Sequence, residues 1–179
     1  DHRDLHSFPT RRSSDLAEET ELTGYMKLRL WVEARPGRNP RDSPDDMGIF
    51  VAINKRDRRQ QSVHFYGSVV NQQDMVTRGW GRAARRELDP VGSTEWNPVL
   101  KAARDEKLKP GEIVPLEIAL YPSSTFFAAG EVIELIVSAQ AIIPSPPYLK
   151  DVSFNRGIQV IHLGGDCDSH LLIPQVPVG

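Results

Sequence analysis

The chain has 179 residues, enough for one ordinary domain, of which 39% are hydrophobic and 26% charged. A total of 22 Lys and Arg against 24 Asp and Glu gives a formal net charge of -2, which argues against a dedicated nucleic-acid-binding protein. Glu, Pro or Gly interrupts every apolar stretch, so we expect no membrane span. The single cysteine excludes an internal disulfide framework. These features together predict a soluble globular domain.

The first 16 residues differ in character from the rest of the chain. They have no apolar periodicity and lack the hydrophobic segment of a secretory signal. The stretch HSFPTRRSSDL, residues 6–16, resembles the conceptual translation of a widely used sequencing-adapter oligonucleotide. We therefore expect residues 1–16 to be a non-native leader and residues 17–179 to be the native C-terminal part of a longer protein. A natural disordered tail is the alternative, and a native gene that encodes these residues would establish it.

The first part of the native region predicts two strands separated by a long loop. Residues 25–33 (YMKLRLWVE) alternate strictly, with Met26, Leu28, Leu30 and Val32 on one face, as in a half-buried strand. Residues 35–46 hold three prolines and no apolar anchor, which predicts a loop. The run GIFVAI at 48–53 is typical of a strand buried on both faces.

The remainder of the chain continues with short strands and turns. We predict strands over residues 63–70, 76–84, 113–121, 131–139, 157–163 and 170–176. Pro115 indicates an edge or strand-start position, because proline cannot donate a hydrogen bond to a neighbouring strand. The connections are a charged turn at 54–61, an irregular stretch at 88–107 with a helical turn around 99–104, a link at 126–130 and a proline-rich crossover at 143–149. This pattern predicts an all-β fold, a jelly-roll β-sandwich.

Few residues combine into a catalytic pattern. A serine hydrolase usually carries its nucleophile in a G-x-S-x-G turn, which this sequence lacks. Ser169 and His170 are the one local pair, but adjacent strand residues point to opposite faces, so one cannot act as base for the other.

Two acidic or mixed clusters invite a metal-site interpretation. The densest is His162, Asp166, Cys167, Asp168 and His170, whose spacing departs from the usual zinc patterns and favours a polar turn with a buried free cysteine. The second is Asp42, Asp45 and Asp46, which lack the spacing and glycine of a calcium loop and favour a solvated loop.

Two basic runs suggest RNA binding as an alternative. They are Lys55, Arg56, Arg58 and Arg59, followed by Arg78, Arg82, Arg85 and Arg86 around Trp80. The overall charge opposes this interpretation, and Asp57 and Glu87 interrupt the runs. Solvated turns or an ion-pair surface between domains explain them better.

Four segments resemble one family closely. They are TELTGYMKLRLWVEA (20–34), RGWGRAARREL (78–88), LKPGEIVPLEIALYPSSTFFAAGEVIELIVSA (108–139) and HLGGDCDSHLLIPQVP (162–177). This chain is similar to the C-terminal non-catalytic domain of X-Pro dipeptidyl-peptidase and cocaine-esterase-like (CocE/NonD) serine hydrolases. The loop at 35–46 is longer and richer in proline and arginine than the family pattern.

The resemblance implies a galactose-binding-domain-like jelly roll that follows an α/β-hydrolase domain. In the family, that upstream domain carries the Ser-Asp-His triad, so none of the family's catalytic residues maps onto this chain. We therefore expect no catalytic, cofactor-binding or metal-ligating residue here, and an isolated chain without hydrolase activity. The expected partner is the α/β-hydrolase domain of the same polypeptide, which Trp31 and Trp80 are candidates to contact. Self-association stays open.

Carbohydrate binding is the alternative function, because exposed aromatic side chains beside polar groups form sugar sites. Trp31, Trp80 and Trp96 lie in three separate segments, which ranks this alternative second. A metal-dependent enzyme built on the cluster at 162–170 ranks third. The sequence leaves the parent's substrate open between peptides, esters and amides. It also leaves the compartment open, with the cytoplasm favoured.

Overall fold

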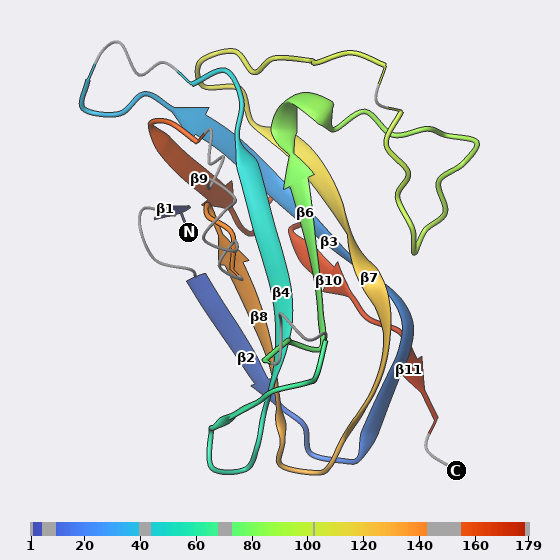
Figure 1. Cartoon of the computed structure of the whole chain (residues 1–179). Helices are drawn as coiled ribbons and strands as arrows, with labels where there is room; N and C mark the ends of the chain where they lie inside the picture. Colours follow the sequence, from blue (N-terminus) through green and yellow to red (C-terminus); the bar gives the residue numbers. More distant parts are fainter. Residues whose placement is uncertain are drawn as a thin grey trace.

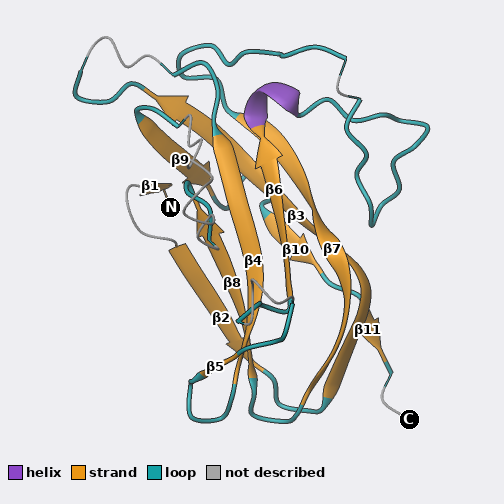
Figure 2. Ribbon diagram, viewed as in Figure 1, coloured by secondary structure: helices purple, strands orange, loops and turns teal. Residues whose placement is uncertain are grey.

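The computed structural model describes residues 2–4, 10–39, 44–67, 73–101, 103–142 and 155–177. Their strands form two antiparallel sheets packed face to face as a β-sandwich (Figures 1 and 2). A single turn of 3-10 helix, η1 (Ala83–Arg85), follows the sixth strand. No helix within the described ranges is long and apolar enough to cross a membrane.

The first sheet is organised around one long strand, β3 (Thr20–Arg35). Along one side of β3 runs β7 (Val114–Phe127), and along the other side lie, in succession, β9 (Ile158–His162), β10 (His170–Leu172) and β11 (Gln175–Val176). The short β1 (His2–Asp4) pairs with β9. Because β7 has β3 as its one strand partner in the described structure, Pro115 lies on an edge strand, as its chemistry requires.

The second sheet is centred on β4 (Gly48–Arg56), which pairs with β8 (Val132–Ser138) on one side. On its other side β4 pairs with β6 (Thr77–Arg82) and then with the two-residue β5 (Ser62–Val63). The outer edge of β8 is covered by β2 (Thr10–Asp15), in a register that opposes Asp15 to Val132.

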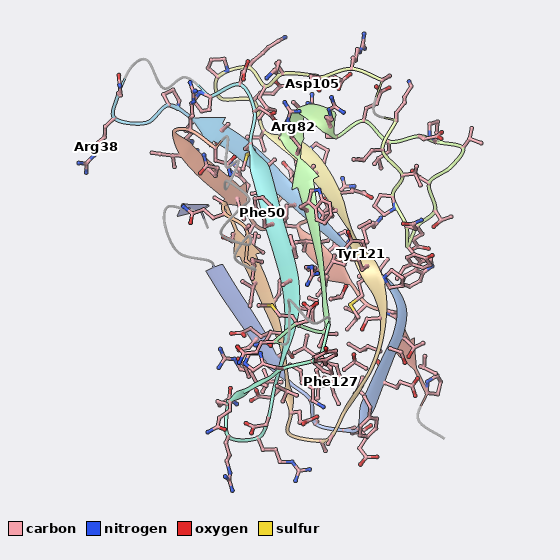
Figure 3. The ribbon with its side chains drawn as sticks, viewed as in Figure 1. Arg38, Phe50, Arg82, Asp105, Tyr121 and Phe127 are labelled. Carbon is pink, nitrogen blue, oxygen red and sulfur yellow. The ribbon has the colours of Figure 1, made fainter. Side chains whose placement is uncertain are left out.

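The core lies between the sheets and is built from the inward faces of the strands. Each buried Leu, Ile or Val stabilises the fold by about 1.5–3 kcal/mol relative to exposure. Phe127, at the end of β7, is the largest fully buried side chain and lies between the layers (Figure 3). The main contributors are Leu22, Met26, Leu28, Leu30 and Val32 of β3, Ile49, Val51 and Ile53 of β4, and Val114, Leu116, Ile118 and Leu120 of β7. The alternation predicted for residues 25–33 is therefore confirmed, and β7 shows the same alternation of buried and more exposed positions over residues 114–121.

Several predicted boundaries are wrong. Residues 54–56 continue β4, and the charged turn begins only at Asp57, because Asn54 and Arg56 bind the buried carboxylate of Glu134. Phe126 and Phe127 belong to β7 rather than to a connection. Within residues 63–67, the described part of the strand predicted at 63–70, only the end of β5 and one bridge at Phe65 are found. The strand at 170–176 is divided into β10 and β11 around Ile173 and Pro174.

The helical turn predicted around residues 99–104 is also wrong. Val99 accepts a hydrogen bond from the Asp89 amide, and the Lys101 amide donates to Glu87, so the backbone pairs across the loop instead of coiling. Among the residues that the structure describes, the one turn of helix is η1, immediately after β6. The proline-rich crossover at 143–149 lies outside the described residues, as do residues 40–43 of the long loop.

Two polar side chains, the buried Asp46 and the half-buried Asn155, fix the loops at one end of the sandwich. The Asp46 carboxylate accepts hydrogen bonds from the amides of Met47 and Ala84, each at 2.8 Å, and from Arg82 Nε at 2.5 Å. The Asn155 side chain bonds both backbone groups of Gly48 and the carbonyl of Ala139. Each side chain therefore satisfies backbone groups that the two sheets leave unpaired.

Candidate functional site

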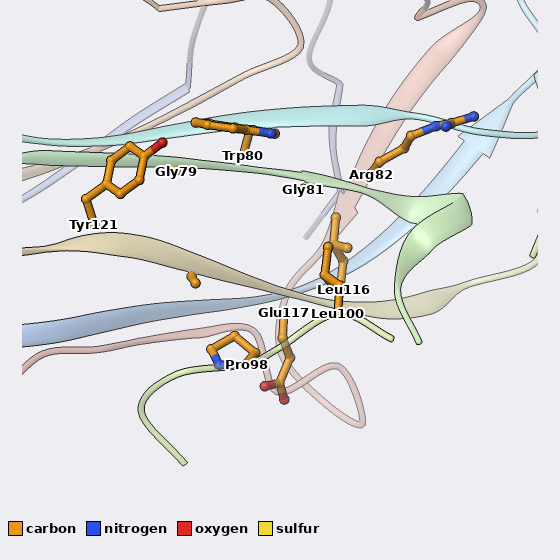
Figure 4. Close-up of a pocket in the computed structure, with 10 residues that line it drawn as sticks. Gly79, Trp80, Gly81, Arg82, Pro98, Leu100, Leu116, Glu117 and Tyr121 are labelled. Atoms are coloured by element: carbon orange, nitrogen blue, oxygen red, sulfur yellow. The ribbon is translucent and has the colours of Figure 1, made fainter. Parts of the chain in front are cut away.

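An exposed pair of aromatic rings marks the edge where the two sheets meet. Trp80 of β6 and Tyr121 of β7 are 59% and 53% exposed. Their ring centroids are 5.9 Å apart and the planes make an angle of 73°, an edge-to-face arrangement (Figure 4). The two strands belong to different sheets, so this pair bridges the open edge of the sandwich.

Two glycines explain why β6 lies so close to β7. A Cβ atom at Gly79 would fall 2.2 Å from the carbonyl oxygen of Ala119, and one at Gly81 would fall 2.7 Å from a carbon of Ile118. The Thr77 hydroxyl closes the same contact by donating to the Tyr121 carbonyl at 2.5 Å. With the flanking positions facing β7, the side chain between the two glycines must point outward.

A groove of about 260 Å³ runs beneath the aromatic pair. Pro98 and Leu100 reach it from the segment at 87–101, hereafter the 87–101 loop (Figure 4). Glu117 lies at one wall, where burial raises the pKa of its carboxyl but ion pairs with Lys27 and Arg29 outweigh it and leave the pKa lowered. The groove is therefore apolar beneath the rings, with its nearby carboxylate already neutralised.

Arg82 closes one end of the groove and belongs to a second charge network. Its guanidinium binds Asp46 and, at 2.9 Å, Asp105, toward which it points in Figure 3. The hydrogen bond to Asp46 raises the pKa of Arg82, against the effect of burial. Arg85 binds the other oxygen of Asp105, so one carboxylate joins two arginines.

Most basic side chains of the two runs form ion pairs or hydrogen bonds within the domain. Lys55 and Arg56 pair with Glu131 and Glu134 at 2.6 and 2.8 Å. Arg58 donates to the Ala129 carbonyl, and Arg78 pairs with Asp74. These contacts join neighbouring loops and strands, and they leave little concentrated positive charge for a phosphate backbone.

Ser169 and His170 do not form a catalytic pair. The Ser169 hydroxyl donates to the His162 carbonyl at 2.9 Å and accepts the Trp31 amide at 3.0 Å, which ties the last turn to β3. The His170 ring lies against the Asp168 carbonyl at 2.6 Å. The Ser169 hydroxyl thus links two backbone segments, and both of these hydrogen bonds are made within the domain.

The residues of the cluster at 162–170, for which the sequence favoured a polar turn over a metal site, are spread apart by the fold. His162 is buried and bonds Glu33 at 2.8 Å, whereas Asp168 is exposed and binds Arg29 and the indole of Trp31. Across the described ranges, no group of three or more His, Cys, Asp or Glu could hold a metal ion. Cys167 lies in a tight turn with Gly164 and is half-buried, not buried as predicted.

The second acidic cluster also differs from its prediction. Asp46 is buried and binds backbone amides rather than solvent, while Asp45 is exposed and pairs with Lys107 at 3.2 Å. Asp42 lies outside the described residues. The prediction of a uniformly solvated loop is therefore wrong at Asp46, because the loop must supply acceptors to the start of β4 and to η1.

Of the three tryptophans, Trp80 is the most exposed. Trp31 is half-buried, with its indole donating to Asp168 at 2.7 Å and Arg29 lying 5.6 Å from its ring centroid. Trp96 is exposed in the 87–101 loop. The sequence analysis missed Tyr121 and Leu100. For Tyr121 a signal existed, since it occupies the outward phase of the alternation through β7.

Comparison with solved structures finds close relatives of this fold. Two crystal structures of a CocE/NonD family hydrolase from Staphylococcus aureus match with TM-scores of 0.85 and 0.88 at 35% and 34% identity. The matches cover 94% and 99% of this chain but only 30% and 32% of the hydrolase. This chain therefore spans about a third of the length of these relatives, in which the equivalent domain is part of a larger hydrolase chain.

More distant structures share the fold alone. An aminopeptidase from a marine sediment Thaumarchaeota archaeon matches at a TM-score of 0.60 and 16% identity, over 96% of this chain and 26% of its own. An α-amino acid ester hydrolase matches at 0.60 and 12%, over 94% and 25%. No curated protein sequence matches this chain. The model of the X-Pro dipeptidyl-peptidase C-terminal non-catalytic domain matches residues 10–172, and the chain accordingly belongs to that family.

Proposed function

We propose that this chain is the accessory C-terminal β-sandwich of a serine hydrolase of the X-Pro dipeptidyl-peptidase or acyl esterase type. It packs on an α/β-hydrolase domain that precedes it in the native polypeptide and supports that domain. The catalytic serine and its partners lie in that upstream domain, and the whole protein transfers an acyl group to water through a seryl intermediate. This chain supplies scaffolding and no nucleophile.

The observation that carries the proposal is the Trp80–Tyr121 groove. Two large aromatic side chains are exposed side by side above an apolar floor, whereas the surrounding arginines and carboxylates are paired within the domain. Aromatic residues with their neighbouring charges already neutralised are typical of the centre of a protein interface. Contacts between domains of one chain bury about 600–1,500 Å², and the exposed β6–β7 edge is where we expect such a contact to be centred.

The same proposal extends to topology and to the leader. The chain passes between the sheets from β3 to β4, from β6 to β7, from β7 to β8 and from β8 to β9, which supports a galactose-binding-domain-like jelly roll. We also propose that residues 1–16 are a non-native leader and that residues 17–179 are the native domain. β2 is held by backbone pairing to β8, which places few demands on side chains, so native residues of another sequence can occupy the same edge.

Recovery of the native coding sequence upstream of Ala17 is the direct test. We expect the frame to continue into an α/β domain with a nucleophile elbow, followed by Asp and His before residue 17. A start codon at that point, or a domain of another class, would refute the proposal. As a second test, a serine-reactive fluorophosphonate should label the recovered full-length protein and leave the 179-residue chain unlabelled.

The docking edge can be tested in that full-length protein. Replacing Trp80 with Ser should loosen the contact between the domains, so that they unfold in two separate calorimetric transitions instead of one. Trp96→Ser is the matched control, because it removes an exposed tryptophan outside this groove. Equal effects of the two variants would show that the β6–β7 edge is not the docking surface.

A further inference from the structure

A second groove, of about 690 Å³, is lined by the 87–101 loop, by Tyr25 of β3 and by residues 173–175. Trp96 and Tyr25 supply its aromatic walls, and Pro174 contributes an apolar surface. Thr94, Asn97 and Gln175 supply its polar groups. None of the described residues that line it carries a charge.

The loop that presents Trp96 is held in shape by its own hydrogen bonds. The Thr94 amide donates to the Asn97 carbonyl at 3.0 Å, and the Asn97 amide returns a bond to the Thr94 hydroxyl at 3.1 Å. Below this turn, the Ser93 hydroxyl bonds both backbone groups of Val99. Trp96 therefore lies on a preformed turn, and a ligand that stacks on it need not pay for ordering the loop.

The opposite wall is equally constrained. Between the pairs Gly24–Ser123 and Met26–Leu120, Tyr25 of β3 lies opposite two residues of β7, so the bulge is on β7 while Tyr25 keeps the outward phase of β3. Gly24 adopts a φ of +135° there. The backbone amide of the preceding residue, Thr23, donates a hydrogen bond to the Pro174 carbonyl at 3.1 Å. The backbone that carries the Tyr25 ring is thus fixed beside Pro174.

The polar groups of the groove have unused hydrogen-bonding capacity. In the described structure, the side-chain amides of Asn97 and Gln175, the Tyr25 hydroxyl and the Trp96 indole N–H make no hydrogen bond within the protein. Amides and hydroxyls both donate and accept, which suits a ligand rich in hydroxyl groups. The absence of lining charge disfavours phosphate, carboxylate and ammonium ligands, whose desolvation needs a countercharge.

We propose that this groove, here called the Trp96 groove, binds a neutral sugar. A pyranose ring presents C–H groups on its faces, which stack on an aromatic platform, and hydroxyls around its rim, which reach the amides. The groove volume lies within the range of small-ligand sites. This site is separate from the docking edge at Trp80 and does not depend on the proposed role in a hydrolase.

The test is binding of the 179-residue chain to an immobilised panel of neutral oligosaccharides and their sialylated or uronic acid counterparts. The neutral oligosaccharide that binds most tightly is then titrated into the chain while tryptophan fluorescence is recorded. We expect saturable binding, weakened at least about tenfold by Trp96→Ala and unchanged by Trp80→Ala, the matched control for an exposed tryptophan. Asn97→Ala, which keeps the platform, should weaken binding by about three- to tenfold for one lost hydrogen bond.

Three results would overturn the proposal. They are no saturable binding to any neutral member, equal loss in Trp80→Ala and Trp96→Ala, and preference for the acidic members. A circular dichroism spectrum identical to that of the wild type keeps the Trp96→Ala result interpretable. Failure here leaves the docking role intact, because that role is measured on the full-length protein through Trp80.

Discussion

Removal of the Asp46 side chain should destabilise the fold strongly. It is buried, and its two oxygens together accept the amides of Met47 and Ala84 and the guanidinium of Arg82. In Asp46→Ala, both amides lose their acceptor in a site that gives water little access. Each orphaned buried group costs about 1–3 kcal/mol, and breaking a buried ion pair costs about 3–5 kcal/mol.

The structure narrows the expected cost. Arg82 is one-third exposed and keeps its ion pair with Asp105. Solvent and this remaining pair therefore partly offset the loss of the ion pair with Asp46. We expect a destabilisation of about 3 kcal/mol, a large share of the roughly 5–15 kcal/mol that holds an ordinary domain. With a urea m-value of about 1–3 kcal/mol/M, the unfolding midpoint should fall by about 1–3 M.

Two further variants make the measurement decisive. Asp46→Asn keeps one carbonyl oxygen for the amides and should cost about half as much. Asp45→Ala, next to it in sequence but exposed, removes one surface ion pair and should cost under about 0.5 kcal/mol. Equal urea midpoints for Asp46→Ala and Asp45→Ala would refute the argument that buried amide satisfaction governs this loop.

Three other outcomes can be measured by the same unfolding assay. Gly79→Ala, whose Cβ would fall 2.2 Å from a backbone oxygen of β7, should cost about 1–3 kcal/mol and more than Gly81→Ala, whose Cβ would meet side-chain instead of backbone atoms; equal costs would contradict this. The hydrogen bond from Arg35 lowers the pKa of Glu33 from 4.5 against the effect of burial. The stability that ionised Glu33 contributes is therefore fully present above pH 4.5 and is lost as the pH falls through the lowered pKa of Glu33. Glu33→Gln should therefore flatten the acid limb of the stability profile, and an unchanged limb would disprove the linkage. Asn155→Ala removes three backbone contacts and should cost about 2 kcal/mol, with faster amide exchange at the start of β4 as its signature.

The sequence predicted the sandwich because its longest strands alternate cleanly. The apolar phase of β3 and of β7 corresponds residue for residue to the buried face, and the lone proline of β7's first half lies on an edge strand. Periodicity reports which face of a strand is buried, so it works where one face is apolar and the other polar. Periodicity was less informative for β8, because Glu134 is buried on the face opposite to that of the buried Ile133.

The candidate sites were harder to predict because they depend on contacts across long separations. The roles of Asp46 and Asn155 require η1 and the start of β4 to be near them, which no local pattern encodes. Trp80 was identifiable from its flanking glycines, but its partner Tyr121 lies 41 positions away on the other sheet. The Trp96 groove combines residues from β3, from the 87–101 loop and from the last strands.

The pairing of β3 also has a consequence for synthesis on the ribosome. β3 is the first strand after residue 17, yet its partners β10 and β11 are the last strands of the domain, and Lys27 pairs with Leu172. The first sheet therefore cannot close until residues 170–176 have emerged, and until then the edge of β3 that faces away from β7 lacks these backbone pairing partners. The nascent β3 is thus the segment for which a chaperone, or an already folded neighbour, has the longest time to act.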